Sequence, residues 1–244
     1  MSTIEGKSLK VGVFIPSCID QFSPQTGRNL LHLLRQAGCQ CYYPSPLTDS
    51  GAELYFSGDR EGAKMLGERL IEMYKDCAYV VSCGSGDVAY VRRYFGELFN
   101  NTAYHNESHR FAEKMFDISH FLVHVAHFVP SGLSFPHRVA FMDHCRTLRD
   151  YGIKEEPRQL LQAIDGLELC EIAHQGICCG FGSVFTNSFE PISTEMARQK
   201  VNAALVVGAQ YLVSTEPSCL MHLQSYIDKV GLNLQCRNFV DLMV

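Results

Sequence analysis

The chain has 244 residues, 46% of them hydrophobic, and a formal net charge of -5 at pH 7, so it can fold without disulfides as one large domain or two smaller ones. No run of Lys or Arg is longer than Arg92-Arg93, which argues against nucleic acid or an anionic membrane as the main partner. No apolar stretch approaches the roughly 18 residues of a transmembrane helix, and the N-terminus has no apolar signal region, so we expect a cytoplasmic protein without a transmembrane segment.

Strands and helices alternate in the first half of the sequence. The runs from Lys10 to Pro16 and from Tyr79 to Ser82 are rich in β-branched residues and predict short buried strands. Amphipathic helices are predicted from Asn29 to Ala37 and from Asp59 to Asp76. A helical connector is expected around Phe111 to Phe128.

The second half of the sequence replays this order. Strands are predicted at 138–142, 167–173 and 211–214, and helices at 157–164 and 194–207. Such alternation predicts an α/β fold of two pseudo-repeated halves, each a small parallel sheet flanked by helices. A stretch rich in Pro, Gly and Ser at 130–136 separates an N-terminal repeat at 1–134 from a C-terminal repeat at 135–244.

The two halves can be aligned on their predicted strands. Laying VGVFIPSC over RVAFMDHC pairs Cys18 with Cys145. Laying YVVSCGSGD over YLVSTEPSC pairs Asp87 with Cys219. Between these anchors, Asp49-Ser50-Gly51 falls opposite Cys178-Cys179-Gly180. The second half therefore carries cysteines where the first half carries mainly oxygen side chains.

Eleven cysteines are many for a cytoplasmic chain, and their odd number fits poorly with a disulfide framework. Five lie in or beside apolar runs and are predicted to be small hydrophobic residues: Cys39, Cys41, Cys77, Cys170 and Cys236. Cys145, the pair Cys178-Cys179 and Cys219 instead follow predicted strands of the second half. The carboxyl ends of parallel strands meet at one crevice, so we expect these four thiols to lie close together.

Clustered thiolates are soft ligands that select zinc, copper or an iron-sulfur cluster. The adjacent Cys178 and Cys179 suit a bridged cluster better than tetrahedral zinc, whose cysteine ligands usually have a spacer of roughly two to four residues. Gly180 and Gly182 permit positive backbone φ, so main-chain amides can point at the sulfur atoms of a bound cluster.

The cysteine motifs of the second half resemble those of the cysteine-rich CCG domain family. Cys145, then CCGFG at 178–182, then CLMH at 219–222 stand in the order of that family. The family includes a cysteine-rich component of heterodisulfide reductase, the iron-sulfur subunit of glycolate oxidase and lactate utilisation protein A. The segments GIKEEPRQLL, CCGFGSVF and VSTEPSCLMH are most similar to the last of these, and the resemblance covers nearly the whole chain.

The resemblance implies two CCG repeats and a [4Fe-4S] cluster in an intact repeat. Its ligands would be Cys145, Cys178, Cys179 and Cys219. It also implies electron transfer beside other iron-sulfur or flavin subunits during lactate or glycolate oxidation, with no catalytic residue in this chain.

The sequence departs from the family pattern in both repeats. In the first repeat Asp49-Ser50 replaces the double cysteine and Asp87 replaces the later one, so of the expected set only Cys18 remains. That implies a repeat without a cluster, although Cys83 lies nearby, offset by four residues from the expected position. In the second repeat the last cysteine of the family pattern is His222, whose imidazole is a candidate metal ligand.

A zinc-stabilised scaffold is the main alternative, with Cys145, Cys178 or Cys179, Cys219 and His222 closing a tetrahedral site without redox work. A cysteine hydrolase, in which His144 activates Cys18 or Cys145, is weaker because the sequence offers no residue to orient the base. No G-x-G-x-x-G follows the first strand, and the glycine-rich segment at 84–86 lacks the Lys of a P-loop.

Histidines gather on the predicted connector. His120, His124 and His127 share a helical face at i, i+4 and i+7. No carboxylate of matching spacing accompanies them, so a packing or solvated face is predicted rather than a metal site.

Overall fold

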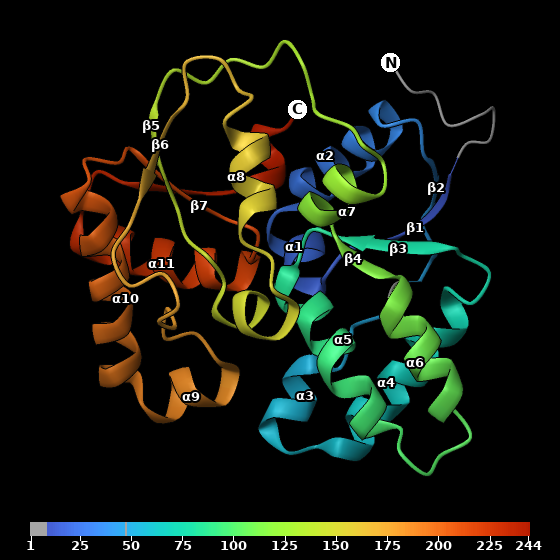
Figure 1. Cartoon of the computed structure of the whole chain (residues 1–244). Coiled ribbons are helices and arrows are strands. Elements are labelled where there is room, and N and C mark those ends of the chain that lie inside the picture. Colours follow the sequence, from blue (N-terminus) through green and yellow to red (C-terminus); the bar gives the residue numbers. More distant parts are fainter. Residues whose placement is uncertain (1–8, 47) are drawn as a thin grey trace.

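The computed structural model describes residues 9–46 and 48–244, and it contains two parallel sheets of four strands each. The first sheet has the order β2-β1-β3-β4, with β1 (Lys10–Phe14), β2 (Gln40–Tyr42), β3 (Tyr79–Ser82) and β4 (Met115–Asp117). The second has the order β6-β5-β7-β8, with β5 (Arg138–Phe141), β6 (Glu168–Glu171), β7 (Tyr211–Ser214) and β8 (Gln235–Asn238). The predicted α/β fold of two pseudo-repeated halves is confirmed, and Figure 1 shows the halves side by side.

Helices follow the strands in both halves. In the first half they are α1 (Ser17–Phe22), α2 (Pro24–Gln36), α3 (Ala52–Ser57), α4 (Arg60–Met73), α5 (Ser85–Leu98), α6 (His105–Lys114) and α7 (Ile118–His124). In the second half they are the π-helical turn η1 (Thr147–Tyr151), α8 (Glu155–Leu161), α9 (Ser183–Ser188), α10 (Glu190–Val206), α11 (Pro217–Val230) and the 3-10 helix η2 (Phe239–Leu242). None of the helices within 9–46 and 48–244 combines the length and the apolar character that a membrane crossing requires.

Local sequence explains where the main helices begin and end. Asp59 caps α4, since its carboxylate accepts a hydrogen bond from the amide of Gly62 at 2.9 Å. Glu216 caps α11 in the same way through the amide of Ser218, at 3.3 Å, and Pro217 occupies the first helical position. The cap of α11 matters for the site because it fixes the start of the helix that carries Cys219.

The segment predicted as a helical connector is interrupted by a strand. Met115–Asp117 pairs in parallel with β3 and extends the first sheet, between α6 and α7. The prediction of a helical connector around Phe111 to Phe128 is therefore wrong for these three residues. The helical pattern on either side is real, but pairing with β3 decides the conformation of these three residues.

One hydrophobic core is shared by the two halves. It joins Val13 and Val81 of the first sheet to Val139 and Val213 of the second, while two smaller cores each serve one half. The contacts between the halves form two symmetry-related pairs. In the first pair, α7 packs on α8 and η2 packs on α2. In the second pair, α5 packs on η1 and α1 packs on α11. This pseudo-twofold arrangement brings the loops after β1 and β3 opposite those after β5 and β7.

Candidate functional site

The four predicted cysteine ligands lie together beyond the carboxyl ends of β5, β6 and β7. Cys145 precedes η1, Cys178 and Cys179 lie in the loop between β6 and α9, and Cys219 lies in the first turn of α11. The Sγ atoms of Cys179 and Cys219 are 2.8 Å apart. Cys178 neighbours both Cys145 and Cys179, whose thiols act on its pKa. Thiols far apart in the sequence thus form one continuous group.

The CCG loop presents amides to sulfur. The amide of Gly180 donates to Cys178 Sγ at 3.4 Å, and that of Phe181 donates to Cys179 Sγ at 3.5 Å. Gly180 has φ +95°, and a Cβ there would lie 2.5 Å from the carbonyl oxygen of Ser193, so only glycine fits. Gly182 differs from the prediction: its φ of 173° is extended, and its amide donates to Thr186 Oγ1 rather than to sulfur.

The thiols share protons unequally. Hydrogen bonds from the Cys145 and Cys179 thiols lower the pKa of Cys178. Its hydrogen bond to Cys178, together with burial, raises the pKa of Cys145, and hydrogen bonds to Cys178 and Cys219 raise the pKa of Cys179. One thiolate at Cys178 is therefore favoured, whereas several buried thiolates would repel one another. Deprotonation of the whole group requires a bound cation, which is what a metal centre supplies.

Two histidines support the loops around the thiols. His222 Nε2 lies 3.2 Å from Ser193 Oγ, and that hydroxyl donates to the carbonyl oxygen of Gly180 at 2.8 Å. His144 Nδ1 lies 2.9 Å from Thr147 Oγ1 in η1, beside the cavity described below. His222, a candidate metal ligand in the sequence, thus contacts the backbone support of the CCG loop.

A cavity of about 230 Å³ opens between the two halves at the cysteine group. The second half contributes Cys145, Cys178 and Cys219 to its wall, and the first half contributes Cys18, Asp49 and Asp87. Acidic side chains predominate in the described wall: Asp49, Glu53, Asp87 and Glu216 face a single cation, Arg146. Burial, and then the nearby Asp49, raise the pKa of Asp87 well above its usual range.

The first half reproduces the geometry of the cysteine group with oxygen atoms. The hydroxyl of Ser50 donates to Asp87 Oδ1, in the place where Cys179 meets Cys219. The amide of Gly51 donates to Asp49 Oδ1 at 3.3 Å, as that of Gly180 donates to Cys178. Gly51 also has a positive φ, +83°. The aligned positions of the two repeats therefore make equivalent contacts, although the ligand chemistry has changed from sulfur to oxygen.

The remaining cysteines lie away from this group. Cys18 lines the cavity, but Cys83 is fully buried in the shared core and does not reach the wall. Cys39 and Cys77 are buried, and Cys41, Cys170 and Cys236 are partly buried. Every cysteine in the chain falls within residues 9–46 and 48–244, and all are free thiols.

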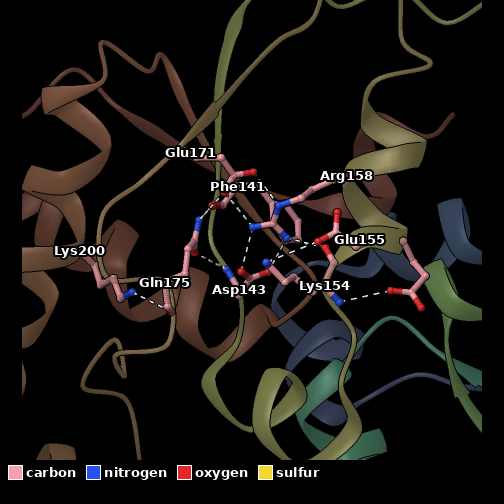
Figure 2. Close-up of polar contacts among 9 residues, drawn as sticks. Phe141, Asp143, Lys154, Glu155, Arg158, Glu171, Gln175 and Lys200 are labelled. Carbon is pink, nitrogen blue, oxygen red and sulfur yellow. Dashed lines mark hydrogen bonds and ion pairs between the residues drawn. The ribbon is translucent and has the colours of Figure 1, made fainter.

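A buried arginine links the loops that carry Cys145 and Cys178 (Figure 2). The guanidinium of Arg158 donates to both carboxylate oxygens of Asp143, at 2.8 and 2.9 Å, and to those of Glu171, at 2.6 and 2.9 Å. The amide of Asp143 in turn donates to Gln175 Oε1 at 3.0 Å, and Gln175 Nε2 donates to the carbonyl oxygen of Phe141 at 2.7 Å. This network fixes the positions of the two cysteine loops relative to each other.

No motif or spacing in the sequence by itself pointed to this network. A signal was present, since a basic residue on the helix after β5 and acidic residues at the ends of β5 and β6 all occupy one sheet edge. Their spacing alone does not specify that Arg158 reaches both carboxylates.

Comparison with known proteins agrees with the cysteine motifs. The cysteine-rich domain family, CCG, matches residues 139–224. Lactate utilization protein A of Geobacillus thermodenitrificans (strain NG80-2) is 30% identical over 235 residues, which cover 96% of this chain and 98% of that protein. Lactate utilization protein A 1 of Bacillus cereus (strain AH820) is 28% identical over 236 residues, with the same coverage of 96% and 98%.

One solved structure has a similar fold. A hypothetical protein from Helicobacter pylori superposes with a TM-score of 0.67 at 10% identity over 98% of this chain and 49% of that one. This chain thus spans about half the length of that protein, and the likeness concerns the fold alone.

Proposed function

Because this chain belongs to the lactate utilization protein A family, we propose that it acts in lactate utilization as an iron-sulfur electron-transfer subunit. Cys145, Cys178, Cys179 and Cys219 would be the ligands of a [4Fe-4S] cluster. The observation that carries the proposal is the convergence of these four thiols on one group beneath the amides of the CCG loop.

The chemistry of the donor set fits an iron-sulfur group. Cysteine thiolates are the usual ligands of such clusters, and hydrogen bonds to sulfur together with burial adjust their reduction potential. Two such hydrogen bonds are present here, from Gly180 and Phe181, and Cys179 and Cys219 are buried. Gly180 allows the loop to approach the helix α10 closely enough for those amides to face the sulfur atoms.

When bound, the cluster would supply one-electron transfer, and the protein residues would hold it and shield it from water. Arg158 fixes the loops that carry Cys145 and Cys178, and Ser193 with His222 fixes the backbone of the CCG loop.

Chemistry on the 2-hydroxy acid is assigned to a partner, a flavin or another iron-sulfur subunit. Lactate and glycolate are anions at neutral pH, and the described wall of the cavity sets four carboxyl side chains against Arg146 alone. Even with Asp87 protonated, as its raised pKa favours, three carboxyl groups outnumber Arg146, and a small anion entering the cavity would be repelled.

A second candidate function is a zinc-stabilised scaffold subunit of the same complex. The observation that favours it is the close approach of the Cys179 and Cys219 sulfur atoms, which are 2.8 Å apart. Two thiolates on one tetrahedral zinc ion lie about 3.8 Å apart, so a small separation of these side chains would admit zinc, whereas an extended cluster needs a larger one. Cys145, Cys178 or Cys179, Cys219 and His222 would then form a closed site without redox work.

Anaerobic purification distinguishes the two functions. The electron-transfer subunit is expected to be brown, with about four iron and four sulfide per chain and visible absorption that changes on reduction. A colourless protein with one zinc per chain would support the scaffold instead. A protein that takes up neither metal under anaerobic reconstitution would refute both.

A further inference from the structure

Two histidines and a carboxylate meet on the surface where the halves touch. His120 and His124 lie one turn apart on α7, and Glu156 lies on α8, which packs against α7 (Figure 1). His124 Nε2 is 2.9 Å from Glu156 Oε1, and His120 Nδ1 is 3.4 Å from the same oxygen. The carboxylate that the sequence spacing failed to reveal is therefore supplied by the other half of the molecule.

The three ligand atoms lie near enough to one another to share one zinc ion after small side-chain movements. Zinc binds His nitrogen and carboxylate oxygen at about 2.0–2.2 Å, which places neighbouring ligands of a tetrahedron about 3.3–3.6 Å apart. All three ligand atoms here lie within 4.8 Å of one another. Among residues 9–46 and 48–244, no other three His, Cys, Asp or Glu side chains meet that criterion.

The surroundings hold the three side chains in place. The His120 ring is partly buried and stacks on Tyr151 of η1, with centroids 5.3 Å apart, and its centroid lies 5.8 Å from that of the Phe116 ring. The side chain of Glu156 is only 15% exposed, whereas that of His124 is 52% exposed, which leaves access for a metal ion and water.

The nearest cations have other partners. Arg92 stacks over Tyr151 and donates to the carbonyl oxygens of Ala112 and Met115. Lys154 pairs with Glu155 at 3.5 Å.

We propose that His120, His124 and Glu156 bind a zinc ion that clamps α7 to α8, with water in the remaining position. Two imidazoles and one carboxylate form a donor set that suits zinc and leaves its fourth position open. The equivalent contact on the other side of the pseudo-twofold axis needs no metal, because Asp241 accepts hydrogen bonds from Thr26 and Asn29, each at 2.9 Å. The zinc would thus strengthen one of two related contacts between the halves.

Zinc content and thermal stability test this site separately from the thiols. We would compare the full-length wild type with the variants His124→Gln and Glu156→Gln. The same three proteins would be measured again with the additional substitution Cys179→Ser. The matched control is His127→Asn. His127 follows α7 with φ +48°, its Nδ1 lies 3.1 Å from the carbonyl oxygen of Val123, and Asn tolerates this backbone conformation.

A chain with His124 is expected to bind one more zinc ion than the corresponding His124→Gln chain, both with and without Cys179→Ser. At zinc about a hundredfold above the dissociation constant, the Tm of the wild type and of His127→Asn should rise by about 5 °C or more. His124→Gln and Glu156→Gln should show no rise. Equal zinc content in the wild type and His124→Gln would overturn the site, and binding without a rise in Tm would overturn the clamp.

Discussion

Replacement of Arg158 by Met is the sharpest test of how the cysteine loops are held. The Asp143 side chain is 3% exposed and the Arg158 side chain 8%, so the variant leaves a carboxylate buried without its partner. Removing one member of such a pair costs about 3–5 kcal/mol. Glu171 is 54% exposed and regains water, so its share of the loss is at most about 1 kcal/mol.

The loss should be visible as a lower melting temperature. For a chain of this size, 1 kcal/mol corresponds to about 2–4 °C, so the Tm of Arg158→Met should fall by about 6–20 °C in circular dichroism melts at pH 7. The double variant Asp143→Leu/Arg158→Met removes both charges and should recover most of the loss. The exposed pair of Arg198 with Glu195 offers a control, since Arg198→Ala should leave the Tm unchanged.

Arg158→Met should also lose the bound metal, because Asp143 and Gln175 position the loops of Cys145 and Cys178. A Tm within about 2 °C of the wild type, or a double variant less stable than the single one, would refute the account of Arg158.

Three further changes test the site and the fold. Cys179→Ser should abolish the visible absorption and leave the first half folded, whereas Cys77→Ser, in a separate core, should keep the colour; equal loss in both would contradict the assignment. Gly180→Ala should cost about 2–4 kcal/mol in urea unfolding, from its positive φ and its clash with a carbonyl oxygen, while Gly152→Ala, with φ +80° and open space, should cost about 1 kcal/mol. Burial raises the pKa of Asp117 from 3.8 to about 6, so the folded chain keeps a proton that the unfolded chain releases, and stability should fall as pH rises from about 4 to 6. Asp117→Asn in chelator-treated protein should remove this fall of about 3 kcal/mol, and an undiminished fall would show that another group causes it.

The strands and the main helices were predictable from local patterns. Runs rich in β-branched residues mark β1 and β3, short apolar runs mark β5 and β7, and glycines with positive φ, Gly38 and Gly208, follow α2 and α10. The convergence of the thiols was predictable as well, because parallel strands deliver their carboxyl ends to one edge. Strand β4 was not predictable in this way, because its three residues follow a helical pattern and form a strand only by pairing with β3.

Residue type and order alone encode the repeat, the CCG motif and the substitution of oxygen for sulfur in the first half. The contact of Ser50 with Asp87, equivalent to that of Cys179 with Cys219, depends on the three-dimensional fold, as does the contact of Glu156 with two histidines on the other half. Both are contacts between segments far apart in the chain. The strand order within each sheet brings the first pairs together, and the packing of the two sheets about a pseudo-twofold axis brings Glu156 to the histidines; no local spacing encodes either.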